Sequence, residues 1–340
     1  MREVCRWVVL SVPLGLVMVA HGTAQQPTVP PPVIDMHMHA ARADSQGPPP
    51  LGLCPGNVFP APEPPRPWSE SFMAWMKKPP CADPIWSPMT DREVMDRSLA
   101  IMKRRNVFGV VSGVLLEDWR KAAPDRVIPS LDLNFAPPAR TLDSVRKAFA
   151  DGGYRAFGEI AIQYQGAEPG DSRFEPYLAI AEELDIPVSI HVGTGPPGAA
   201  YLGFPNYRGR LHSPLLIEEA LIGHPRLRVS LMHAGWPMLD DLLAAMWTHP
   251  QLYVDVGAIG FALPAAGFYS YLQRIVEAGF GKRVMFGSDQ MIWPETIDVV
   301  IDRIELAGFL TADQKRDILY NNAARFLRLS PQEIARHHGR

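Results

Sequence analysis

The stretch that decides the fold is Val33-Ile34-Asp35-Met36-His37-Met38-His39-Ala40. Its first four residues are apolar in the main and rich in β-formers, which predicts a short buried strand. Side chains two apart on a strand share a face, so His37 and His39 should point toward one place just beyond the strand. Imidazole suits zinc and similar ions, so the pair indicates a metal site. Taken alone, the pair fits two ordinary core or surface histidines equally well.

Beyond residue 91 the chain alternates between helical patterns and short apolar runs. Counting the first strand, the predicted strands are 33–36, 108–114, 127–131, 156–160, 187–191, 228–233, 252–255 and 283–289. The predicted helices are 91–105, 116–122, 141–151, 175–184, 215–223, 238–249, 268–278, 295–307 and 313–327. This alternation indicates parallel strands joined by crossover helices, and eight units match an α/β fold of the (β/α)₈ TIM-barrel type. A doubly wound open sheet is the alternative, although no G-x-G-x-x-G motif follows the first strand.

A proline-rich insertion at residues 46–88 separates the first strand from this repeat. Its proline clusters remove backbone donors, which disfavours long helices and central strands. It also carries Trp68, Phe72, Trp75 and Trp86, which are too apolar for a free linker. We therefore expect an ordered lid, with a short helix at 69–76, that covers the site next to the histidine pair.

The N-terminus has the pattern of a secretory signal peptide. Two arginines flank the start of an apolar run at residues 7–20, and Gly22-Thr23-Ala24 supplies small residues before a cut after Ala24. An uncleaved membrane anchor is the alternative, but the run is short for a span of about 20 residues. We therefore expect a signal peptide at 1–24 and an exported protein, periplasmic or secreted.

The expected mature chain is one barrel domain at 25–330, with residues 331–340 as a C-terminal tail. Cys5 leaves with the peptide, so Cys54 and Cys81 remain. In an oxidising compartment they can form a disulfide, and two free thiols are the alternative. A net charge of -3 argues against a nucleic-acid partner. The expected partner is a small-molecule substrate, with no membrane contact after cleavage, and a homodimer is left open.

Ligand-type side chains fall at the predicted carboxyl ends of the strands, which is the catalytic face of such a barrel. Each has an ordinary explanation: Glu159, for example, could pair with Arg155 or Lys147 instead. Their convergence on one mouth is the stronger signal, because metal and catalytic sites require such clusters. The predicted metal-binding residues are His37, His39, Glu159, His191, His233 and Asp289.

These residues lie in motifs that resemble the amidohydrolase superfamily, in particular the amidohydrolase-related proteins grouped with the carboxymuconate-semialdehyde decarboxylases. The resemblance covers residues 33–329 apart from the insertion. The matching motifs are Ile34-Asp35-Met36-His37-Met38-His39, Gly158-Glu159-Ile160, Ile190-His191, Met232-His233-Ala234-Gly235, Phe286-Gly287-Ser288-Asp289 and the closing stretch 318–327.

The resemblance implies a divalent metal, expected to be zinc, with one or two ions per chain. It implies that His37, His39 and Asp289 bind the first ion and that His191 is a further ligand. His233 would bind a second ion or act as an acid or base, and Asp289 would be the other catalytic residue. Glu159 stands where two-metal members often carry a bridging carbamate or glutamate.

Three functions remain in competition. The favoured one is a metal-dependent hydrolase in which metal-activated water attacks an amide, ester or lactone carbonyl, because one-metal decarboxylating relatives need no carboxylate at position 159. The alternative is a one-metal non-oxidative decarboxylase of a small carboxylic acid. A barrel that has lost catalysis is disfavoured because all six ligand-type residues are present.

The candidates for substrate contact rest on weaker signals. They are Trp86, Arg208, Trp236 and Trp293, together with Tyr201, Tyr207 and His212 in the loop after the fifth predicted strand. Asp255, at the end of the seventh predicted strand, is expected to lie behind the metal ligands.

Overall fold

The computed structural model describes residues 30–56, 59, 61, 65–133 and 140–340. The expected signal peptide therefore lies outside the described residues. Within them, no helix combines the length and the apolar character needed to cross a membrane.

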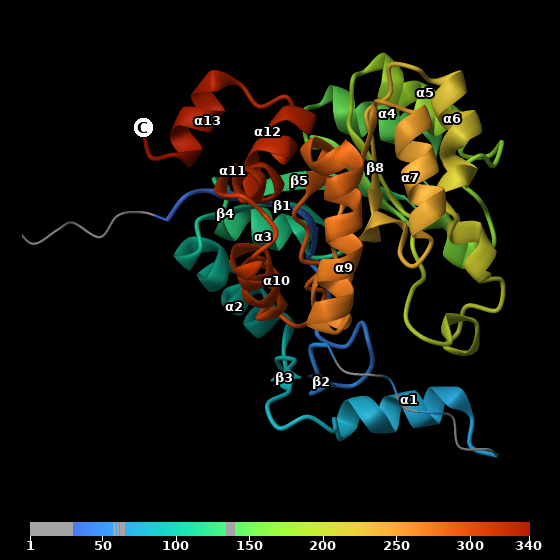
Figure 1. Cartoon of the computed structure of the whole chain (residues 1–340), viewed down its shortest axis with the longest axis vertical. Coiled ribbons are helices and arrows are strands. Elements are labelled where there is room, and N and C mark those ends of the chain that lie inside the picture. Colours follow the sequence, from blue (N-terminus) through green and yellow to red (C-terminus); the bar gives the residue numbers. More distant parts are fainter. Residues whose placement is uncertain (1–29, 57–58, 60, 62–64, 134–139) are drawn as a thin grey trace, which may run out of the picture.

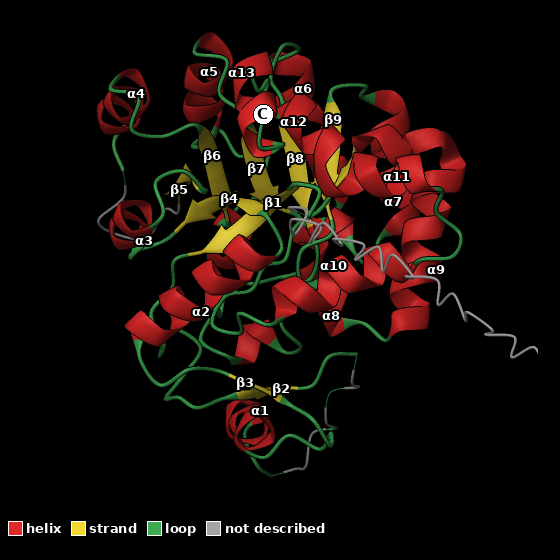
Figure 2. Cartoon of the chain, turned by 90° about the vertical axis from the view of Figure 1, so that its left-hand side faces the viewer, coloured by secondary structure: helices red, strands yellow, loops and turns green. Residues whose placement is uncertain are grey.

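Eight parallel strands form the centre of the molecule, in the chain order β1-β4-β5-β6-β7-β8-β9-β10. Backbone N–H groups of Met36 and Asp289 donate to the carbonyls of Phe286 (2.9 Å) and His37 (2.8 Å), which joins the last strand region to β1. Helices surround the sheet (Figures 1 and 2), so the predicted TIM barrel is confirmed. The strands are β1 Val33–His39, β4 Val107–Ser112, β5 Val127–Leu133, β6 Ala156–Ile160, β7 Val188–His191, β8 Val229–Met232, β9 Leu252–Asp255 and β10 Val284–Met285.

The longer helices of the barrel, such as α2, α4, α9 and α10, are amphipathic and bury an apolar face. Several begin at polar caps: the Thr90 and Thr311 side chains accept the backbone N–H of Glu93 and Gln314. The helices are α2 Asp91–Arg104, α3 Leu116–Ala122, α4 Leu142–Ala150, α5 Glu175–Glu183, α6 Glu218–Gly223, α7 Leu239–Thr248, α8 Ile259–Ala262, α9 Ala265–Ile275, α10 Thr296–Leu306, α11 Ala312–Arg316, α12 Asn322–Phe326 and α13 Pro331–His337.

The predicted last strand, 283–289, ends early. Only Val284 and Met285 pair with β9. A Cβ on Gly287 would lie 3.0 Å from both His37 Cβ and Asp255 Oδ1, and Asp289 has a positive φ of 50°. The chain therefore leaves the sheet because it must pass close to β1 and then turn Asp289 toward the mouth.

The proline-rich insertion forms a small layer at one end of the barrel, away from α12 and α13 (Figure 1). It holds the helix α1 Trp68–Lys77, close to the predicted 69–76, and a two-stranded antiparallel ribbon of β2 Gly52–Leu53 and β3 Ile85–Trp86. Cys54 and Cys81 form a disulfide with a Cα–Cα distance of 5.9 Å, so the predicted bridge is confirmed. The Trp68 indole donates to the Pro197 carbonyl at 2.7 Å, which ties α1 to the loop after β7. That the insertion acts as a lid remains a prediction.

Candidate metal centre

His37 and His39 lie on the same face of β1, as their spacing predicts, with ring centroids 5.1 Å apart. His37 is buried at 1% exposure, whereas His39 is partly open to solvent. Both faces of the strand are buried along most of its length because β1 lies in the parallel sheet of the barrel. The pair therefore offers two nitrogens at the carboxyl end of the barrel.

Glu159 on β6 lies among four imidazoles. Its Oε2 is 3.5 Å from His39 Nε2 and 3.8 Å from His37 Nε2. Its Oε1 is 2.6 Å from His191 Nδ1 and 3.8 Å from His233 Nε2. The alternative pairings of Glu159 are not made, because Arg155 pairs with Glu333 and Lys147 pairs with Asp151.

Asp289 completes the cluster from the turn after β10. Its Oδ1 lies 3.0 Å from His39 Nε2 and 3.6 Å from His37 Nε2, and its Oδ2 lies 3.9 Å from His233 Nδ1. His191 Nδ1 and His233 Nε2 are 3.0 Å apart. The structure thus brings all six predicted ligand residues together.

This cluster has the composition and spacing of a site for a divalent metal ion. Three of its triads have ligand atoms within 4.8 Å of one another, namely His37–His39–Glu159, His37–His233–Asp289 and Glu159–His191–His233. His37 Nε2 is buried without a hydrogen-bond partner, although it lies between two carboxylates. A buried nitrogen without a partner is costly, and a cation would satisfy it.

The charges of the cluster depend on one another. Burial raises the pKa of Glu159, but the hydrogen bond with His191 and the nearby imidazoles of His233 and His37 outweigh it and hold that pKa well below its usual value. Burial likewise raises the pKa of Asp289, and His37 and His39 lower it further than burial raises it. Burial lowers the pKa of His37, yet Asp289 and Asp255 bring it well above the ordinary value. Both carboxylates of the cluster are therefore available as anionic ligands.

His233 has one ring nitrogen that bonds to the backbone and one that faces the cluster. Its Nδ1 lies 2.9 Å from the Gly257 carbonyl, which can only accept, so Nδ1 carries a proton. Nε2 is then the atom that can bind an ion or exchange a proton. His233 itself follows β8 in the turn η5 His233–Gly235 with a positive φ of 61°. Such strained backbone is typical of functional sites.

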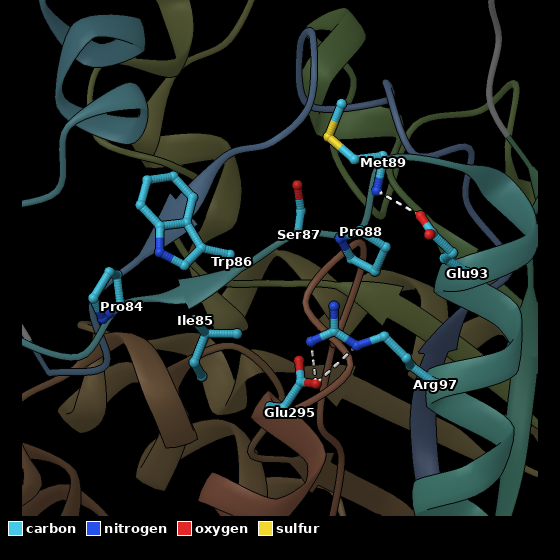
Figure 3. A pocket seen from close by; sticks show the side chains of 9 residues that line it. All are labelled: Pro84, Ile85, Trp86, Ser87, Pro88, Met89, Glu93, Arg97 and Glu295. Carbon is cyan, nitrogen blue, oxygen red and sulfur yellow. Dashed lines mark hydrogen bonds and ion pairs between the residues drawn. The ribbon is translucent and has the colours of Figure 1, made fainter.

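The four substrate-contact candidates lie in different surroundings. Trp86, which is 41% exposed, lines a cavity of about 540 Å³ between β3, α2 and the start of α10, where Arg97 donates to Glu295 (Figure 3). None of the six clustered residues lines this cavity. The buried Trp293 donates its indole N–H to the Leu51 carbonyl at 2.9 Å, so it anchors the insertion.

The other two candidates belong to turns. Trp236 is partly buried just after η5, and its carbonyl accepts from the Thr194 N–H at 2.9 Å. Arg208 is exposed, and its guanidinium donates to the carbonyls of Pro205 and Tyr207 in its own loop. Arg208 is thus held within that loop.

One aromatic residue beside the cluster escapes the sequence analysis. Tyr164, in the turn η1 Ile162–Gln165, has its ring 5.1 Å from His191 and 5.2 Å from Tyr207. His212 is fully buried with its ring 5.4 Å from His191, and Tyr207 accepts the Gly195 N–H. Tyr164 follows directly on the strand that carries Glu159, which is the one signal that could have found it.

Comparison with known proteins gives a family and a fold. A family model described as amidohydrolase matches residues 34–329. No curated protein matches the sequence. An uncharacterised TIM-barrel protein from Bordetella bronchiseptica is similar in structure, with a TM-score of 0.56, 18% identity and coverage of 91% of this chain and 99% of that one.

Two decarboxylases have the same fold. A manganese-bound mutant of 5-carboxyvanillate decarboxylase from Novosphingobium aromaticivorans has a TM-score of 0.57 at 14% identity, covering 88% of this chain and 97% of that one. The 2,6-dihydroxybenzoate decarboxylase from Rhizobium has a TM-score of 0.51 at 15% identity, covering 88% of this chain and 99% of that one.

Proposed function

The chain belongs to the amidohydrolase family, and from that premise we propose that it is a one-metal, non-oxidative decarboxylase of a small carboxylic acid. This choice reverses the preference for hydrolysis that the sequence suggests. Structural neighbours that carry out decarboxylation support it. The proposal further holds that the protein is exported and acts on a small molecule without nucleic acid or membrane.

The spacing of the ligand atoms carries the one-metal part of the proposal. At bond lengths of about 2.0–2.2 Å, two ligand atoms on one tetrahedral ion lie roughly 3.4 Å apart. The separations among His37 Nε2, His39 Nε2, Glu159 Oε2 and Asp289 Oδ1 include 3.0, 3.5, 3.6 and 3.8 Å, which fits one ion. The other oxygen of Glu159 faces His191 and His233. There His191 Nδ1 lies 2.6 Å from Glu159 and 3.0 Å from His233, which are hydrogen-bond lengths. They leave less room for a second ion.

When bound, the divalent ion would supply a Lewis acid that binds the substrate and offsets the negative charge that develops during the reaction. His37, His39, Asp289 and Glu159 would hold it. A bound manganese in one neighbour makes Mn²⁺ as suitable an expectation as Zn²⁺.

The carbon–carboxylate bond breaks with its electron pair left on carbon, CO₂ departs, and a proton must reach that carbon. The nearby carboxylates of Glu159 and Asp289 raise the pKa of His233 above its ordinary value in spite of burial. Its Nδ1 stays bound to the Gly257 carbonyl, so Nε2 is the atom that would deliver the proton.

Hydrolysis is the second candidate, and one observation favours it. Glu159 turns a different oxygen toward each histidine pair, as a carboxylate that bridges two ions would. In that case Asp289 would be the base that takes a proton from water.

The test is direct assay of both reactions. Protein loaded with Mn²⁺ or Zn²⁺ is incubated with 5-carboxyvanillate, 2,6-dihydroxybenzoate and a panel of small carboxylic acids, and CO₂ release is measured. Parallel reactions with esters, amides and lactones are followed by acid release. Metal-dependent CO₂ release supports the proposal, whereas turnover confined to the second panel would replace it with the hydrolase.

A further inference from the structure

Asp255 lies directly behind the metal centre, at the end of β9. It is fully buried, and its Oδ1 accepts the backbone N–H of Gly257 at 2.8 Å and that of His233 at 3.3 Å. The same oxygen is 3.5 Å from His37 Nδ1, an ion-pair contact longer than a hydrogen bond, on the side of the ring opposite the nitrogen that faces Glu159 and Asp289. One carboxylate oxygen thus meets two of the clustered histidines.

The surrounding backbone is shaped to allow this approach. A Cβ on Gly257 would lie 2.6 Å from His37 Nδ1 and 2.9 Å from Asp255 Oδ1. A Cβ on Gly287 would lie 3.0 Å from the same oxygen. Glycine at both positions therefore lets the carboxylate and the imidazole approach each other closely. An aspartate with a purely structural role at this strand end would not need so close an approach to an imidazole.

We propose that Asp255 is a positioning residue that keeps the proton of His37 on Nδ1, so that Nε2 faces the metal site as a free lone pair. The Gly257 carbonyl, two residues on, does the same for His233, whose Nδ1 it holds at 2.9 Å. The turn 255–257 thereby sets the tautomer of His37 on β1 and of His233 just after β8. Partners of this kind orient metal-binding histidines and raise their basicity, and their loss typically weakens metal binding about 10- to 100-fold.

Asp35 provides a matched control. It is equally buried, two residues before His37, and its Oδ1 accepts the backbone N–H of His37 at 3.0 Å and that of Ser288 at 2.9 Å. In both aspartates the second carboxylate oxygen has no hydrogen-bond partner. They differ in that Asp35 bonds to backbone whereas Asp255 also faces an imidazole nitrogen.

The experiment compares Mn²⁺ affinity in Asp255→Asn and Asp35→Asn by competition with a chelator, on full-length folded protein. We expect Asp255→Asn to raise the dissociation constant about 10- to 100-fold and Asp35→Asn to leave it within about threefold. Equal affinities of Asp255→Asn and the wild type would overturn the proposal, as would equal losses in both variants. The inference rests on the metal site of the proposed function and not on its reaction, so a failed decarboxylation assay leaves this result unaffected.

Two further measurements keep the test decisive if Asp255→Asn does not fold. Gly257→Ala places a methyl group between His37 and Asp255 while the carboxylate stays, and the same weakening of Mn²⁺ binding is expected. In wild-type protein labelled with ¹⁵N-histidine, NMR spectra of the metal-free form, recorded at a pH high enough for His37 to be neutral, should show its single ring proton on Nδ1. A proton on Nε2 would overturn the assignment.

Discussion

Replacing Glu159 by glutamine tests how many ions the site holds and what the carboxylate does. The amide keeps the shape of the side chain but removes its charge, so contacts with four imidazoles weaken together. The shortest of them joins Glu159 Oε1 and His191 Nδ1 at 2.6 Å, a charge-assisted hydrogen bond in a buried site. Such bonds are worth about 1.5–3 kcal/mol, which converts to a loss of roughly 10- to 150-fold in kcat/KM.

The assay has two independent readouts. Metal content per chain is measured by mass spectrometry after loading with Mn²⁺, and kcat/KM is measured on the best carboxylic acid found. Under the one-ion proposal, Glu159→Gln keeps close to one ion per chain because His37, His39 and Asp289 remain, while kcat/KM falls by the stated factor. Under the two-ion hydrolase, metal content falls from two toward one.

Glu333→Gln is the matched control. Glu333 also has a strongly lowered pKa, to about 2, because the Ser330 backbone, the Ser330 hydroxyl and Arg155 outweigh the effect of burial, but it caps α13 at the other end of the barrel. Its loss should leave metal content and kcat/KM unchanged. A Glu159→Gln protein with wild-type kcat/KM, or with one of two ions lost, would refute the reasoning from these distances.

Three further predictions concern the rest of the chain and its cofactor. Burial lowers the pKa of His337 to about 4, where its ring stacks on Phe108 with centroids 3.6 Å apart. As pH falls from 6.5 to 4 the unfolded chain takes up a proton at this residue before the folded chain does, so His337 should lower the free energy of unfolding by roughly 2 kcal/mol once solvent screening is allowed for. Urea titrations across that range should show a loss of stability that is smaller by this amount in His337→Phe than in the wild type. Reduction of the Cys54–Cys81 bridge, which spans 27 residues, should lower stability by about 3 kcal/mol without changing metal content, as urea unfolding with and without reductant will tell. Mass spectrometry of protein from its native cell should find a chain that starts near Gln25, and an intact Met1 would contradict export.

All eight strands could be predicted, because parallel strands that are buried on both faces have short apolar runs in the sequence. Residues such as His191 stand out because each ends one of these runs, and barrel topology alone then carries them to one mouth. The two-residue ribbon of β2 and β3 could not be predicted, because Gly52 and Trp86 pair across 34 positions and neither strand is long enough to show alternation.

Residues outside the strands were harder to place. Tyr164 meets His191 only because η1 turns the chain back over the mouth after β6, and no periodic pattern marks that turn. Arg208 has the chemistry of a carboxylate binder, yet its guanidinium donates to two carbonyls of its own loop. Side-chain type is thus readable from sequence, whereas the partner that it meets depends on backbone geometry.

The choice between hydrolysis and decarboxylation also depends on backbone geometry that the sequence does not reveal. A glutamate in an apolar strand predicts a compensating cation, and the family resemblance suggested a bridge between two ions. The one-ion proposal rests on the distances from Glu159 to His191 and from His191 to His233, which are set by the register of β6, β7 and β8. At 2.6 and 3.0 Å these groups already satisfy one another, so the carboxylate is compensated without a second cation. The feature that favoured hydrolysis therefore fits one ion once the neighbouring strands are placed.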